Sequence, residues 1–304
     1  MPKKNITLAT RESPLALWQA NWVRTELQKF YPDLKVTLLG LTTEGDKSLD
    51  VSLNKIGGKG LFVKELEEAI LNGKADIAVH SMKDVPMTLP KGLIISAMCE
   101  RFDPRDVFVS NDFETIKELP PYAVLGTSSL RRQSQLLSLY PHLKIENIRG
   151  NVNTRVSRLD KNEFAGLILA AAGLKRLGME DRISSYLSLE ESLPAAGQGV
   201  LGVECRENDF EIQELISVLN HNETERSVKA ERAMCLKLGG GCQVPIAAYA
   251  KMQKDALELI GLVGSLDGRT LLKVSKTGNN PEELGLNVAQ DLLAEGAGDI
   301  LNAL

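Results

Sequence analysis

A cysteine that follows three glycines is the first residue here whose setting could support chemistry. Cys242 comes directly after Gly239, Gly240 and Gly241. Consecutive glycines are unfavourable in helices and strands, so this stretch predicts a tight loop that presents the thiol. A cysteine becomes a nucleophile as its thiolate, which neighbouring cations favour. The alternative is a free surface thiol after a glycine turn, the commoner outcome for so short a motif.

A lysine and an aspartate stand together where a strand is expected to end. Residues 75–80 predict a short strand, and Lys83 and Asp84 follow it closely. Such a pair could hold or move a proton in acid–base chemistry. In the alternative, Asp84 is structural and its carboxylate caps nearby backbone N–H groups.

Two arginines open a predicted helix that Ser129 caps. Arg131 and Arg132 fall in its first turn. The N-terminus of a helix is already partly positive, so each cation there costs about 0.3–1 kcal/mol unless an anion offsets it. A bound anion would meet free N–H groups, the helix dipole and two guanidiniums together. Alternatively, both side chains extend into solvent, which screens the cost.

Arg11 and Ser13 lie in the turn between an apolar strand at 6–10 and a helix that starts at Pro14. Serine is a favoured N-cap, and proline is favoured at the first helical position. A second strand at 35–41 completes a β–α–β unit, which predicts a parallel sheet. Ligands bind such sheets outside the carboxyl ends of the strands. Arg11 is therefore a candidate binding residue, with an ordinary surface arginine as the alternative.

The remaining pattern predicts an α/β fold with two lobes and a small α+β domain at the C-terminus. Residues 42–60 are polar and glycine-rich, which predicts a long loop that could close as a lid. Connections are expected at 99–105 and 193–199, and the strand at 200–205 could return to the first lobe. The other expected strands are 93–98, 123–126, 144–147, 166–170, 245–251, 257–264 and 270–276, and the other expected helices are 61–72, 129–140, 151–161, 209–219, 222–238 and one after 280.

The charge distribution argues for a small anionic ligand. The 304 residues carry a net charge of −4, which does not suit a nucleic-acid-binding protein. Residues 126–176 nevertheless hold nine Lys or Arg against three acids, a local excess of +6. A solvated charged face is the alternative. The four cysteines and three histidines lack zinc-site spacing, and no signal peptide or membrane span is evident, so we expect a reduced, cytoplasmic protein.

Eight motifs along the whole sequence resemble those of the porphobilinogen deaminase family, also called the hydroxymethylbilane synthases. Each motif is weak alone, but the ordered set is highly specific. Cys235, near Cys242, is not part of the family pattern. The matching stretches are 10–16, 57–60, 80–86, 126–132, 148–155, 172–176, 196–199 and 240–245.

The resemblance implies three domains and a covalent cofactor. The first two domains, residues 1–99 with 200–217 and residues 100–199, would resemble the lobes of periplasmic binding proteins. Residues 218–304 would form the cofactor-attachment domain. The resemblance implies a transferase, with a dipyrromethane joined by a thioether to Cys242, that couples four porphobilinogen molecules, releases ammonia and frees hydroxymethylbilane with water. It implies a monomer with no nucleic-acid or membrane partner.

The resemblance also assigns roles to individual residues. Asp84 would carry the catalysis and contact the cofactor. The cofactor would further be held by Lys83, Ser129, Arg131 and Arg132, and the substrate by Arg11, Ser13, Lys59, Arg149, Arg155 and Arg176, with Lys59 on the closing loop. Two other classes of protein compete with this reading: a non-catalytic anion-binding protein with two closing lobes, and the effector domain of a regulator.

Overall fold

The computed structural model describes residues 3–47, 63–241 and 243–304. The chain forms two compact units, each built from separated stretches of sequence. The first unit contains Met1–Arg101 and Val200–Glu225, and the second contains Phe102–Gly199 and Arg226–Leu304. The chain therefore leaves the first unit after Arg101 and re-enters it at Val200.

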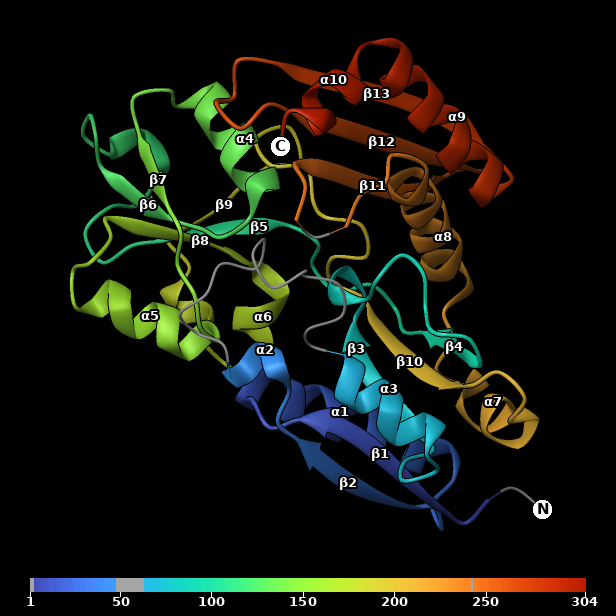
Figure 1. Cartoon of the computed structure of the whole chain (residues 1–304). Helices are drawn as coiled ribbons and strands as arrows, with labels where there is room; N and C mark the ends of the chain where they lie inside the picture. Colours follow the sequence, from blue (N-terminus) through green and yellow to red (C-terminus); the bar gives the residue numbers. More distant parts are fainter. Residues whose placement is uncertain (1–2, 48–62, 242) are drawn as a thin grey trace. The chain divides into compact units, whose positions relative to one another are not determined.

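A five-stranded sheet forms the centre of the first unit (Figure 1). Its strand order is β2-β1-β3-β10-β4, in which β1 pairs in parallel with both β2 and β3, and β10 runs antiparallel to β3 and β4. The predicted return of residues 200–205 to the first lobe is thus confirmed. The strands are β1 (Asn5–Arg11), β2 (Lys35–Leu41), β3 (Ile77–Ser81), β4 (Leu93–Met98) and β10 (Leu201–Arg206).

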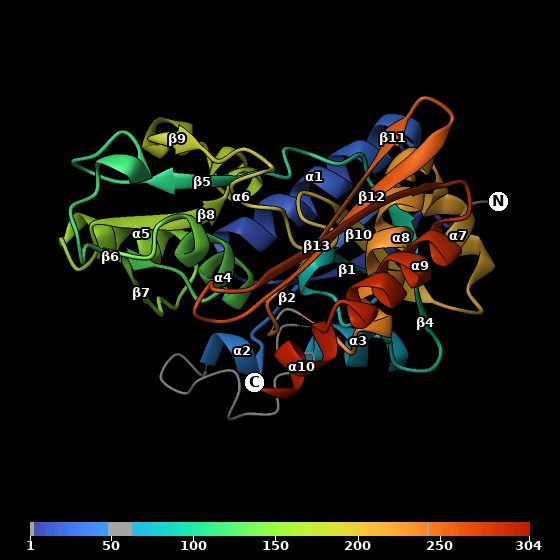
Figure 2. The ribbon, with the colours of Figure 1, turned by 90° about the horizontal axis from the view of Figure 1, so that it is seen from above.

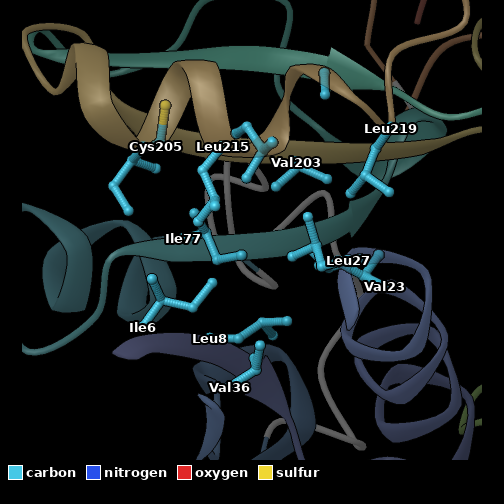
Figure 3. Packing of buried hydrophobic residues seen from close by; sticks show 14 of the residues in the cluster. Ile6, Leu8, Val23, Leu27, Val36, Ile77, Val203, Cys205, Leu215 and Leu219 are labelled. Carbon is cyan, nitrogen blue, oxygen red and sulfur yellow. The ribbon is translucent and has the colours of Figure 1, made fainter. Parts of the chain in front are cut away.

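Helices cover both faces of this sheet and so bury its central strands on both sides. Side chains alternate along a strand, so Ile77 and Val79 of β3 share one face with Val203 of β10. Helices α1 (Pro14–Phe30) and α7 (Phe210–Ser217) pack there, as Figure 3 shows for Val23 and Leu215. Helix α3 (Lys64–Leu71) covers the opposite face.

The loop predicted at residues 42–60 is partly helical in the described part. Residues Glu44–Lys47 form the short helix α2, so the expected loop is interrupted. Residues 48–62, which include Lys59 and the motif at 57–60, lie outside the described residues. The helix expected from residue 61 begins at Lys64.

A second five-stranded sheet lies in the second unit, with the order β7-β6-β8-β5-β9. Strands β6, β7 and β8 are parallel, whereas β5 is antiparallel to β8. The sequence did not predict β5 and β9, because runs of four and two residues are too short for a clear alternation. The elements are β5 (Asp106–Val109), β6 (Val124–Gly126), β7 (Lys144–Glu146), β8 (Gly166–Ala170), β9 (Ser185–Tyr186), α4 (Leu130–Leu139), α5 (Val152–Asp160) and α6 (Ala171–Arg176).

A three-stranded antiparallel sheet completes the second unit, as the sequence predicted (Figure 2). Helix α9 packs along one of its faces, and Leu193 packs with Ala247 and Leu262 on the other. Helix α8 begins within the first unit and continues into the second. The elements are β11 (Ile246–Gln253), β12 (Ala256–Gly264), β13 (Leu271–Gly278), α8 (Asn222–Lys237), α9 (Pro281–Ala294) and α10 (Ala297–Asn302).

The α/β fold class with a small C-terminal α+β part is confirmed by these three sheets. The two five-stranded sheets follow one pattern, in which three parallel strands are joined by an antiparallel strand that arrives from elsewhere in the chain. None of the helices in the described ranges is both long and apolar enough for a membrane span. The division into three domains at residues 99, 199 and 217 stays a prediction.

Candidate active site

Four predicted site residues of the first unit lie at the carboxyl ends of two neighbouring strands. Arg11 is the last residue of β1, and Ser13 caps α1 by accepting a hydrogen bond from Ala16 N over 3.4 Å. Lys83 and Asp84 lie in a short 3-10 helix (Met82–Asp84) directly after β3. Because β1 and β3 are adjacent and parallel, both turns lie at the same edge of the sheet.

A pocket opens at this edge. It brings together Arg11, Ser13 and Asp84, three of the predicted site residues. Gln19 steadies the wall by donating a 2.9 Å hydrogen bond from Nε2 to Ser81 Oγ. The lining residues are Arg11, Ser13, Leu15, Ala16, Gln19, Val63, Leu66, Val79, His80, Ser81 and Asp84.

Asp84 is exposed, although Met82 beside it is buried. Exposure suits a carboxylate that meets a ligand better than one that seals backbone N–H groups. Lys83 is half-buried in the same 3-10 helix. Asp84 is therefore the acid that a molecule in the pocket could reach directly.

In the second unit, predicted site residues likewise follow the carboxyl ends of three parallel strands. Arg131 and Arg132 follow β6, Arg149 and Arg155 follow β7, and Arg176 follows β8. The strands are neighbours in the order β7-β6-β8, so these five cations lie along one edge of one sheet. Such an edge suits ligands that carry several carboxylates, which arginine binds in a bidentate manner.

The two arginines of α4 converge on one buried aspartate. Arg131 Nη1 lies 2.9 Å from Asp106 Oδ2, and Arg132 Nη2 lies 2.7 Å from Asp106 Oδ1. Ser192 Oγ donates to Asp106 Oδ2 over 2.7 Å, and Gln198 Nε2 donates to Oδ1 over 2.9 Å. The alternative that both arginines extend into solvent is wrong, since they are 4% and 6% exposed.

This cluster keeps an excess of positive charge. Burial alone would raise the pKa of the Asp106 carboxyl, but Arg131 and Arg132 together hold that pKa far below its usual range. One carboxylate therefore opposes two guanidiniums. The Nε atoms of both arginines are buried and have no hydrogen-bond partner among the described residues. Asp106 thus balances only one of the two positive charges.

Gly150, which lies between Arg149 and Arg155 in sequence, helps to hold Arg155 in place. Gly150 has φ +104°, a conformation that favours glycine, and Arg155 Nε donates a 2.8 Å hydrogen bond to its carbonyl. Asn151 then caps α5 by accepting from Thr154 N over 2.9 Å. Arg149 and Arg155 are both half-buried.

Arg176 makes structural contacts that the sequence did not predict. It is 9% exposed, and its Nη2 donates a 3.0 Å hydrogen bond to the carbonyl of Gly199. Its guanidinium also lies 5.8 Å from the centroid of the Phe102 ring. Arg176 therefore helps to hold in place the connecting segment that ends at residue 199.

The predicted attachment residue, Cys242, lies outside the described residues, as does Lys59. Cys235 is buried at the end of α8, and its carbonyl accepts a 2.8 Å hydrogen bond from Gly240 N in the glycine loop. Burial, followed by the Glu231 charge, raises the pKa of the Cys235 thiol to about 12. Cys235 is thus poorly suited to act as a nucleophile.

Sequence reasoning missed several polar residues behind the site. Asp106 is an acid at the start of a run of apolar residues, and Glu204 is an acid inside an apolar strand. This pattern could have predicted that both are buried. Gln198 lies in the matching stretch at 196–199, whereas Ser192 carries no comparable signal. Within the described ranges, no group of three or more His, Cys, Asp or Glu residues could hold a metal ion.

Two family models match most of the chain. The model "Porphobilinogen deaminase, dipyromethane cofactor binding domain" matches residues 6–214. The model "Porphobilinogen deaminase, C-terminal domain" matches residues 226–294. The matches therefore include both five-stranded sheets and the C-terminal sheet.

Solved structures with a similar chain path include several binding proteins. A putative methionine-binding lipoprotein of Bacillus subtilis is 12% identical, with a TM-score of 0.44, over 73% of this chain and 92% of that chain. The methionine-binding protein MetQ is 14% identical, with a TM-score of 0.46 over the same shares. A nutrient-binding protein from Burkholderia cenocepacia, bound to methionine, is 13% identical, with a TM-score of 0.45, over 72% and 93%. Likenesses this distant identify no ligand for the chain.

Proposed function

The chain belongs to the porphobilinogen deaminase family, and on this premise we propose that it joins four porphobilinogen molecules into the linear tetrapyrrole hydroxymethylbilane. Each coupling would release one ammonia, and water would free the finished chain. The observation that carries this proposal is a single pocket that holds Arg11 and Asp84 together. A cation beside a reachable carboxylate suits a substrate with carboxylate arms and a cationic leaving group.

The described residues fit the dipyrromethane that the family implies. Its acetate and propionate arms are anions, and the Arg131–Arg132 cluster has excess positive charge and two buried Nε atoms without partners. Ser129 and Lys83 would add further donors, and Cys242 would hold the group through a thioether. When bound, the dipyrromethane supplies the ring carbon to which the first substrate is joined.

The substrate arms would be held by arginines at the strand ends. Arg11 and Ser13 face the pocket beside Asp84 and would bind the incoming molecule. Arg149 and Arg155 lie half-buried after β7 and would bind the carboxylates of rings already added. Arg176, which also fixes residue 199, would contribute from β8. Lys59 would close over the bound rings.

Asp84 would carry the chemistry by stabilising positive charge. Loss of ammonia from porphobilinogen leaves a cationic azafulvene, and a preorganised carboxylate nearby lowers the energy of that charge. After carbon–carbon bond formation, the attacked ring carbon loses a proton, and the released ammonia leaves as ammonium with that proton. Asp84 would carry the proton between them.

Turnover with porphobilinogen tests this function. Substrate consumption and ammonia release are measured together for the parent, for Asp84→Ala, and for Asp33→Ala, which removes an exposed acid of the same unit. We expect equal amounts consumed and released, unchanged rates in Asp33→Ala, and a loss of about a hundredfold or more in Asp84→Ala. Binding without consumption by the parent would instead favour an anion-binding protein. Turnover of Asp84→Ala within about tenfold of the parent would refute the role of Asp84.

The proposal also covers the localisation, the oligomeric state and the domain boundaries of the protein. We propose that it works as a cytoplasmic monomer with three domains, residues 1–99 with 200–217, 100–199 and 218–304. The supporting observations are the net charge of −4 and the reduced state expected of four cysteines without paired spacing.

A further inference from the structure

Three titratable side chains are buried together behind the pocket of the first unit. His80 Nε2 lies 2.9 Å from Glu204 Oε2, and these side chains are 4% and 1% exposed. Glu67 is buried on α3, and the charges of Glu204 and His80 act on it. His80 also lines the pocket. It therefore connects the pocket that holds Asp84 with two buried carboxyl groups.

Strand alternation explains why these residues meet. His80 pairs with Gly202, and Glu204 pairs with Ala78, so His80 and Glu204 project from the same face of neighbouring strands. Ala78 packs in the apolar cluster with Leu66, Ala69 and Ile70 of α3, which identifies that face as the one α3 covers. Glu67 lies on the same helix and reaches this face.

The arrangement is costly when both carboxyl groups are ionised. Oε1 of Glu67 and Oε1 of Glu204 are both buried without a hydrogen-bond partner among the described residues. Two buried carboxylates, each with one oxygen that lacks such a bond, disfavour full ionisation. Burial, followed by the Glu204 charge, raises the pKa of Glu67 to about 7, while His80 opposes this shift. Glu68 of the same helix adds a weaker like charge.

On the premise of the proposed function, we propose that Glu67, Glu204 and His80 form a buried triad whose charge adjusts the reaction in the neighbouring pocket. When Glu67 releases its proton, one more negative charge lies behind the pocket. That charge stabilises the cationic azafulvene that Asp84 faces, so the coupling speeds up. Glu67 does not line the pocket and acts on the reaction through its charge alone.

Among the described residues, Arg11 and Asp84 are the charged groups that line the pocket. They bind or stabilise the substrate directly, whereas the triad changes only the field at the pocket. A triad that served only to hold α3 against the sheet would instead affect stability and leave the shape of the pH profile unchanged.

The test is the pH dependence of kcat for cofactor-loaded enzyme with porphobilinogen, from about pH 6 to about pH 8.5. Glu67→Gln keeps the shape of the protonated side chain and removes its titration. Glu68→Gln removes the same charge from the exposed neighbouring position and serves as the control. Glu67→Asp keeps a carboxyl group and serves as a second variant if the glutamine variant folds poorly.

We expect the parent, Glu68→Gln and Glu67→Asp to gain about three- to tenfold in kcat through an inflection near neutral pH. Glu67→Gln should lack the inflection and remain at the low-pH rate, with KM and cofactor content unchanged. The same inflection in Glu67→Gln, or an equal loss at every pH, would overturn the proposal. A parent that consumes no porphobilinogen at any pH overturns the proposed function itself, and the shape of the profile separates the two failures.

Discussion

Arg132 and Asp106 form an ion pair with 2.7 Å between Nη2 and Oδ1, and neither side chain is more than 7% exposed. The pair joins the first turn of α4 to β5, a strand that the sequence did not predict. Arg132 Nη1 also donates a 2.8 Å hydrogen bond to the carbonyl of Ile168 on β8. Asp106 thus fixes the orientation of a proposed cofactor-binding arginine while opposing only part of the local positive charge.

Replacing Asp106 by asparagine should destabilise the protein strongly. The change keeps the shape but leaves Arg131 and Arg132 buried without their shared carboxylate. Breaking a buried ion pair by removing one partner costs about 3–5 kcal/mol in the free energy of unfolding. Urea unfolding measures this loss. Asp112→Asn, at an exposed position of the same unit, should stay within about 0.5 kcal/mol. A loss below about 1 kcal/mol in Asp106→Asn would show that the pair is not what holds α4 to β5.

Glu67 should make the stability fall as pH rises. Its pKa is raised from 4.5 to about 7 in the folded protein, so the folded state binds more protons in that interval than the unfolded state. The stabilisation is complete below the unfolded pKa of 4.5 and is lost as pH rises through about 7. The loss is up to about 3 kcal/mol. Unfolding of the parent and of Glu67→Gln at several pH values isolates this effect, because other groups cancel in the difference. A difference that stays constant with pH would contradict the raised pKa.

Replacing Arg149 by leucine should stop chain growth at a definite length. Arg149 lies after β7, where its guanidinium would hold the carboxylates of rings already joined. Mass spectrometry of the enzyme after brief exposure to porphobilinogen should show one dominant intermediate. Lys161→Leu removes an equal charge from an exposed position of the same unit and should leave the distribution unchanged. A variant that only fails to load its cofactor would point to a different role for Arg149.

Cys235 should be chemically inert in the folded protein. Its thiol is buried, with a pKa near 12, so very little thiolate forms at neutral pH. Alkylation followed by peptide mapping should leave Cys235 unmodified in the native state and modify it after unfolding in urea. Cys235→Ala should load the cofactor as fully as the parent. Native labelling at the rate of the unfolded chain would contradict the buried setting.

Local sequence patterns predicted much of the fold and the placement of the candidate site. Ser13 and Pro14 mark the start of α1, Ser129 marks the start of α4, and both caps form as expected. Arg11 and Asp84 were each predicted in a turn after a strand, and the structure brings them to one pocket. These features depend on neighbours in sequence, which a single chain displays directly.

Long-range pairing explains what the sequence did not reveal. The positions of Arg131 and Arg132 predicted a bound anion. Their partner in the structure is Asp106, about 25 residues away in sequence on a four-residue strand. Glu204 meets His80 only because β10 returns to pair with β3. Neither contact has a local signature, because each depends on which strands become neighbours in the sheet.

The most direct test of the central claim is the intact mass of the purified protein beside a Cys242→Ser variant. The proposed function predicts a fixed excess equal to two linked pyrrole units in the parent and none in the variant. Adding porphobilinogen to the parent should then give discrete heavier species, one for each ring joined. An unmodified parent mass that persists after incubation with porphobilinogen would contradict the covalent cofactor, and with it the proposed reaction.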